Sequence, residues 1–177
     1  MANTFIKLST VNVGVSGIAS ITFTSIPQTF TDLKVVFSTR ANRTGEQVDL
    51  ARITFNDSSS SYSKRDLYGD YTAVYSSSSS GASSYLPQGF SPASSATASV
   101  FSNNEIYISN YTSSSHKSIS SDIVTENNTG TANHGYLTIS AGLWADTAAI
   151  TKITITNHLG TGFSQYSTAT LYGIKSS

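Results

Sequence analysis

The stretch that decides the fold class is Gln165-Tyr-Ser-Thr-Ala-Thr-Leu-Tyr-Gly-Ile-Lys175, which contains no proline and no charged residue before Lys175. In an extended chain, successive side chains point to opposite faces. One face of this stretch then carries β-branched and aromatic residues and the other mostly small ones: Tyr166, Thr168, Thr170, Tyr172 and Ile174 against Ser167, Ala169, Leu171 and Gly173. Because β-branched and aromatic residues are enriched in strands, the stretch is predicted to be a β-strand lying between two neighbours.

The preceding segment, Ile150-Thr-Lys-Ile-Thr-Ile-Thr156, alternates in the same way. Ile153 and Ile155 are expected to face inward, and Lys152, Thr154 and Thr156 outward, as in a sheet with one wet face. Residues 157–163, which join the two segments, are rich in turn formers. We therefore expect the two strands to form a closing hairpin at the chain end.

Short alternating segments recur along the rest of the chain. Residues 5–13 and 18–23 predict two strands joined by a tight connection. Further strands are predicted where inward apolar residues alternate with polar ones, at 33–38, 51–55, 105–109, 118–124 and 136–140, with a short edge strand at 86–90 between Pro87 and Pro92. A strand at 33–38 would bury Leu33, Val35 and Phe37, which contributes on the order of 5 to 9 kcal/mol before entropy is subtracted.

The fold class follows from the number and spacing of these segments. About ten short strands, with turn signals roughly every 8 to 15 residues, predict an all-β, antiparallel β-sandwich of jelly-roll-like type. Only residues 142–149 could form a single helical turn, with Asp146 or Thr147 as its cap.

Two serine-dense stretches, residues 56–62 and 75–84, interrupt this pattern, and the second contains the five consecutive serines Ser76 to Ser80 before Gly81. This is the composition of a flexible linker. It could divide the chain into two domains, but each half would then close only a few strands around a small core. We therefore favour one domain over residues 1–177 with a long loop at 75–84.

Composition excludes several classes of partner. The formal net charge is zero, so no basic surface is expected for nucleic acid or for a membrane of anionic lipid. Only 11% of the 177 residues are charged, and Ser and Thr fill the polar positions instead. Such a surface can pack against a neighbour without removing water from many ions, which favours assembly.

The chain contains no cysteine, so neither a disulfide nor a thiolate metal site is possible. Its first residues lack the basic and apolar regions of a signal peptide, and no apolar run is long enough for a transmembrane helix. If the protein acts outside the cell, it is expected to leave by lysis or as part of a particle.

No metal-binding motif is present. His116, His134 and His158 are the only imidazoles, and no two of them have the spacing that would aim both at one ion. Each lies beside turn formers, where an exposed histidine is ordinary. We predict no metal site and no cofactor.

No catalytic motif is present either. Serine is too common here for a Ser-His-Asp set to be informative, and the Gly-x-Ser-x-Gly motif is absent. The pairs Asp66 with Asp70 and Asp122 with Glu126 could serve glycoside hydrolysis, but they are more simply acids on loops. We predict no catalytic residue and no enzymatic activity.

Tyrosines gather in the middle of the chain, at positions 62, 68, 71, 75 and 85. On loops between strands, tyrosines would offer a flat apolar face with a polar tip to a carbohydrate or a protein. The alternative is that they cover the ends of the sandwich or lie between subunits.

Several segments spread over almost the whole chain share one resemblance. They are Met1–Phe5, Phe23–Leu33, Ile53–Asn56, Tyr107–Tyr111, Glu126–Asn128, Ala141–Trp144, Ala148–Ile150 and, most specifically, Tyr-Ser-Thr-Ala-Thr-Leu-Tyr-Gly-Ile at 166–174. Together they resemble a family of small virion proteins of tailed bacteriophages, common among aquatic and cyanobacterial phages. The serine-rich middle of the chain matches that family least.

The resemblance implies a component of the virion surface, either a capsid decoration (cement) protein or part of a tail fibre or spike. It also implies a jelly-roll-like sandwich that assembles as a homotrimer, with the phage major capsid protein or tail proteins as partners. It supplies no catalytic residue to transfer. The chain has no shaft-forming repeat and its first predicted strand begins close to Met1, which favours capsid decoration.

Two alternatives remain open. Tyrosines on loops would suit a tail-fibre protein that contacts host surface glycans, and a carbohydrate-binding module unconnected with virions is the third possibility.

Overall fold

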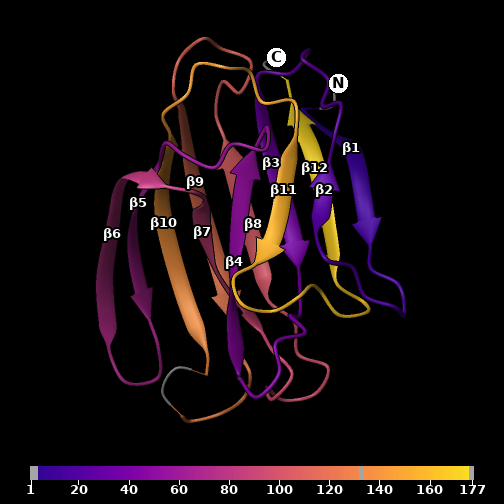
Figure 1. Cartoon of the computed structure of the whole chain (residues 1–177), viewed down its shortest axis with the longest axis vertical. Helices are drawn as coiled ribbons and strands as arrows, with labels where there is room; N and C mark the ends of the chain where they lie inside the picture. Colours follow the sequence, from indigo (N-terminus) through magenta and orange to yellow (C-terminus); the bar gives the residue numbers. More distant parts are fainter. Residues whose placement is uncertain (1–3, 132–133, 176–177) are drawn as a thin grey trace.

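The computed structural model describes residues 4–131 and 134–175, which form twelve strands and no helix. The strands build two antiparallel sheets that pack face to face (Figure 1), so the predicted all-β sandwich is confirmed. In spatial order, the large sheet contains β1 (Phe5–Asn12), β12 (Thr168–Ile174), β3 (Asp32–Ser38), β8 (Asn103–Ile108), β9 (Lys117–Thr125), β10 (Tyr136–Trp144), β5 (Tyr62–Gly69) and β6 (Val74–Ser83). The small sheet contains β2 (Ile21–Phe23), β11 (Ile153–Asn157), β4 (Val48–Phe55) and β7 (Leu86–Pro92).

The hydrophobic core lies between the small sheet and the strands of the large sheet that it covers. The residues predicted to face inward on β3, β4, β8 and β11 are buried in it: Leu33, Val35, Phe37, Ala51, Ile53, Phe55, Ile106, Ile108, Ile153 and Ile155. Three aromatic rings close the core beside β5, since Phe55 lies 5.5 Å from Trp144 and 6.1 Å from Tyr62 between ring centroids. The hydroxyl of Tyr62 accepts a hydrogen bond of 2.8 Å from the backbone N–H of Phe55.

β12 lies between β1 and β3, as the C-terminal stretch predicts. Its small residues face the core, and its threonines and Tyr172 face outward. A Cβ atom at Gly173 would lie 2.5 Å from Cγ of Phe30, so only glycine lets that ring cover the strand. Close packing of Phe30 thus requires a residue without a side chain at position 173 on the inner face of this strand.

The predicted hairpin at the chain end is wrong. β11 pairs with β2 and β4 in the small sheet, whereas β12 lies in the large sheet. The connecting residues cross from one sheet to the other, and the buried carboxylate of Asp49 accepts backbone hydrogen bonds there from Leu159 and Gly160. β1 and β2 also lie in different sheets. Turn-forming residues between two strands are found both in hairpins and in connections from one sheet to the other. Which strands pair is decided by which faces are buried, and the turn residues do not reveal this.

The predicted loop at 75–84 is also wrong, because residues 74–83 form β6 and pair with β5. Neither strand was predicted, which is why about ten strands were expected and twelve are present. As the edge strand of the large sheet, β6 needs hydrogen bonds on one side only and little side-chain burial, so serines suffice. The edge strand predicted at 86–90 is confirmed as β7.

No helical turn occurs at 142–149. β10 continues to Trp144, whose ring is buried in the core, and a turn follows in which Asp146 accepts a hydrogen bond of 2.8 Å from the N–H of Ala148. Asp146 caps this turn and not a helix. Among residues 4–131 and 134–175, no helix reaches the length and apolarity that a membrane span requires.

Candidate functional site

The most unusual region of the molecule is the end of the large sheet formed by β9, β10, β5 and β6. The small sheet ends at its edge strand β7, and β6 lies beyond that edge (Figure 1). In an ordinary sandwich apolar side chains face inward and polar ones face outward, but in this region several polar side chains face inward and apolar ones face outward. On β10, Thr138 and Ser140 are buried while Leu137 and Ile139 are 56% and 59% exposed. On β5, Asp66 is buried and Leu67 is exposed.

The apolar side chains on the outside form one surface, which we call the outer apolar patch: Leu67, Val74, Val124, Leu137 and Ile139. The strand register places them together. Leu137 lies between Val124 of β9 and Gly69 of β5, and Gly69 in turn faces Val74 of β6. Ile139 lies directly opposite Leu67. Exposed apolar side chains that are contiguous mark an interaction surface far more often than scattered ones do.

Charged side chains border the patch on several sides. Asp122 faces Ile139 from β9, and Arg65 faces Ala141 from β5. Glu105 shares a hollow with Ile139, and Asp70 and Glu126 lie near Leu137 and Val124. The other outward positions of β6 are serines. A hollow of about 330 Å³ adjoins the patch at the β5–β6 turn, with Tyr71 on its rim.

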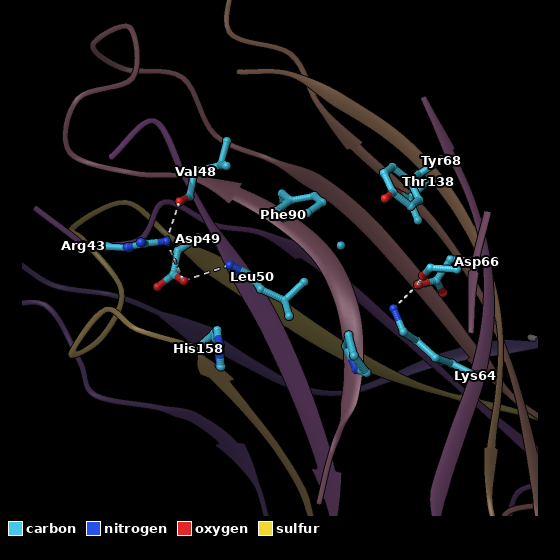
Figure 2. A pocket seen from close by; sticks show the side chains of 13 residues that line it. Arg43, Val48, Asp49, Leu50, Lys64, Asp66, Tyr68, Phe90, Thr138 and His158 are labelled. Atoms are coloured by element: carbon cyan, nitrogen blue, oxygen red, sulfur yellow. Dashed lines mark hydrogen bonds and ion pairs between the residues drawn. The ribbon is translucent and has the colours of Figure 1, made fainter. Parts of the chain in front are cut away.

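The inner side of the same region is a polar cleft of about 330 Å³ (Figure 2). β5, β6 and β10 form one wall, and β4 and β7 form the other. The register of β4 and β7 shifts between Leu50 and Arg52, where β7 carries one extra residue at Pro87 to Phe90. This bulge shapes the small-sheet side, and Figure 2 shows Phe90 between the two charged pairs of the cleft.

The first charged pair comes from β5, where Lys64 donates a hydrogen bond to the carboxylate of Asp66. The same carboxylate accepts hydrogen bonds from Ser140 at 2.7 Å and from Ser77 at 3.2 Å. Asp66 therefore connects β5 with both of its neighbours, β10 and β6. Its burial is possible because each of its oxygens is hydrogen-bonded.

The second pair is Arg43 with Asp49, whose side-chain atoms approach to 3.9 Å. Asp49 is fully buried and accepts hydrogen bonds from the backbone N–H groups of Leu50, Leu159 and Gly160, the last at 2.6 Å. This carboxylate holds the crossing after β11, where the exposed side chain of His158 lines the cleft.

The predicted candidate residues fall in different places. His116 is exposed just before β9, His134 lies before β10, and only His158 lines the cleft. No group of three His, Cys, Asp or Glu side chains in the described residues could hold a metal ion. Asp66 and Asp122 are strand residues and not loop acids, because residues 62–69 and 117–125 form β5 and β9.

The expectation that the five tyrosines lie on loops is wrong for three of them. Tyr62 is in the core, and Tyr68 and Tyr75 are paired strand residues whose rings stack at 5.2 Å. Tyr71 is exposed in the β5–β6 turn. Tyr85, between β6 and β7, lies under the guanidinium of Arg52 at 4.2 Å from the ring centroid. Loops were expected for Tyr62, Tyr68 and Tyr75 because the sequence does not predict the strands β5 and β6 on which they lie.

The sequence did contain one signal for the patch. In residues 136–140, Leu137 and Ile139 alternate with Thr138 and Ser140, but nothing in the pattern says which face is covered. The chain matches no protein-family model, and no curated protein sequence matches it.

Proposed function

We propose that this protein is a structural component of a tailed-phage virion, a capsid decoration protein that binds the outside of the shell through the outer apolar patch. The observation that carries the proposal is the reversed polarity of β10 and β5, which leaves Leu67, Leu137 and Ile139 in water. Burying such residues against a partner is favourable by about 25 cal/mol per Å².

The composition of the surface supports the same role. Only 11% of the residues are charged, and serines of β6 lie beside the patch, so docking dehydrates fewer ions than it would on a surface of average charge. The phage assignment itself depends on the resemblance of the chain to virion proteins. In the proposal the protein is a homotrimer that acts by contact area, because three patches bound to one shell would bind far more tightly than one.

The second candidate is a tail-fibre or receptor-binding protein, which the polar cleft favours because decoration needs no ligand cleft. Immunogold electron microscopy of purified particles separates the two. Label spread evenly over the heads is the expected result. Label confined to tails would replace decoration by the second candidate, and particles without label would overturn both.

A further inference from the structure

One edge of the large sheet is open to a further strand. β6 has β5 as its neighbour on one side, and in the part of the chain that the structure describes no strand lies on its other side (Figure 1). Residues 74–79 pair regularly with residues 64–69, and the register of this pairing shifts only beyond Ser79. The outer backbone N–H and C=O groups of this regular stretch are therefore placed as pairing with another strand requires.

The other three edges of the two sheets are protected against such pairing. β1 carries Lys7 and a register shift between Lys7 and Ser9, and β2 is only three residues long. β7 carries Pro87 and Pro92 and a register shift of its own. Charged residues, prolines, bulges and short strands are the means by which natural sheets prevent edge-to-edge pairing. Residues 74–83 contain no charged residue and no proline, so β6 is the edge left open.

A second copy of the chain can meet this edge only with its own β6, because its other three edges are protected. Two identical strands related by a two-fold axis perpendicular to the sheet pair antiparallel, and each donates and accepts the same hydrogen bonds. Residues 76–80 are all serine, so small and uncharged side chains would lie opposite one another. Such a contact uses up both open edges, so it closes as a pair and does not continue into a fibre.

We propose that two copies of the protein pair through β6 and join their large sheets into one continuous sheet. The two-fold axis passes close to the middle of the regular stretch, between Ser76 and Ser78. An axis perpendicular to the sheet keeps both outer apolar patches on the same face, so the pair presents both patches to one surface. The contact is additional to the proposed trimer, and it does not rest on the proposed virion role.

The affinity of this contact is low. A short strand composed mostly of serine buries little apolar surface, and small interfaces of this kind bind loosely. We expect a dissociation constant on the order of 1 mM. β6 is then free in dilute solution, and it pairs where copies of the protein are crowded together.

The first test is NMR of the isotope-labelled protein at concentrations from roughly 0.05 to 2 mM, a range that spans the expected dissociation constant. The amide resonances of residues 74–79 should shift with concentration, and those of the protected edge β1 should not. Ser76→Lys places a charge on the open edge, where pairing would bring two like charges together, and should weaken the pairing at least about tenfold. Ser9→Lys makes the same change at an exposed serine of β1 and should associate like the wild type.

The second test uses the absence of cysteine from the chain. A single cysteine on the two-fold axis lies opposite its own copy, where Cα atoms of antiparallel strands are about 4.5 to 5.5 Å apart and a disulfide can form. One of the variants Ser76→Cys, Ser77→Cys and Ser78→Cys should therefore cross-link between copies under mild oxidation much faster than Ser9→Cys on β1.

The proposal is overturned if the β6 resonances do not depend on concentration, if Ser76→Lys associates like Ser9→Lys, or if none of the three β6 cysteines cross-links faster than Ser9→Cys. Both tests use the purified protein alone, whereas the immunogold result bears on the decoration role, so the two proposals can fail separately.

Discussion

Gly89 is the residue that allows β7 to pass against β9. Its φ is +69°, and a Cβ atom there would lie 2.2 Å from Cγ2 of Ile123. Gly89→Ala therefore combines backbone strain with a clash in a packed interior. We expect a loss of about 2 to 4 kcal/mol in the free energy of unfolding, measured by guanidinium denaturation.

Gly81→Ala is the matched control, because a Cβ at Gly81 meets nothing within 4 Å and its φ is not in the left-handed region. It should change the free energy of unfolding by no more than about 0.5 kcal/mol. Equal effects at the two glycines would contradict the close approach of β7 to Ile123.

Tyr107 makes the free energy of unfolding depend on pH in the alkaline range. Its hydroxyl donates to the carboxylate of Asp32, and this hydrogen bond, with some burial, raises the pKa of Tyr107 to about 12 from 10.0. The unfolded state then releases the proton first as pH rises. The stabilisation is complete below pH 10.0 and is lost progressively as pH rises toward about 12.

Burial also raises the pKa of Tyr62, Tyr111 and Tyr136, so the wild-type protein should lose stability over the same alkaline range through several tyrosines. Tyr107→Phe should reduce, but not abolish, the slope of unfolding free energy against pH above 10.0. A Tyr107→Phe slope identical to wild type would show that the bond to Asp32 contributes nothing.

At the scale of the elements, β6 is the most exposed part of the sandwich. It is an edge strand paired only with β5, and its central residues are serines. In the isolated protein its backbone amides should exchange with deuterium much faster than those of β3 and β12, which have neighbours on both sides. Mass spectrometry of peptic peptides measures this. Protection of β6 equal to that of β3 would mean that a second chain covers the edge.

Most strands could be predicted because their alternation coincides with burial. Leu33, Val35 and Phe37 face the core as their pattern requires, and the same holds for Ile153 and Ile155. The sheet assignment of a strand could not be predicted in this way. β11 and β12 are adjacent in sequence yet lie in different sheets, since pairing is decided by partners far along the chain.

β5 and β6 escaped prediction for a different reason. Their inner face is polar, with Lys64, Asp66 and Ser77 around the cleft, so alternation carries no sign of a core. Asp66 is stable there because Ser140, over seventy residues away in sequence, donates to it. The candidate site thus consists of the strands that violate the usual pattern, and such violations are expected where function outweighs packing.

At the scale of the whole molecule, one end of the sandwich differs from the other. The β1–β12–β3 end has its core inside and threonines outside, as in an ordinary sandwich. The β10–β5–β6 end has a polar cleft inside and the outer apolar patch outside. The second end therefore offers a partner an apolar surface on one face and a polar cleft on the other.

If the protein decorates a capsid as proposed, the outer apolar patch is what holds it on the particle. The double variant Leu137→Asp/Ile139→Asp, introduced into the genome that encodes the protein, should fold with a near wild-type unfolding midpoint because both side chains are more than half exposed. Docking would lose about 1 to 1.5 kcal/mol of burial at each position, and two carboxylates would enter an apolar contact. The copy number per particle, measured by quantitative mass spectrometry, should fall more than about thirtyfold. Thr168→Asp/Thr170→Asp places the same two charges on the outer face of β12, away from the patch, and should leave the copy number unchanged. If the patch variant folds and is retained on particles like this control, the patch is not the docking surface, and the shell contact must lie on another face of the sandwich.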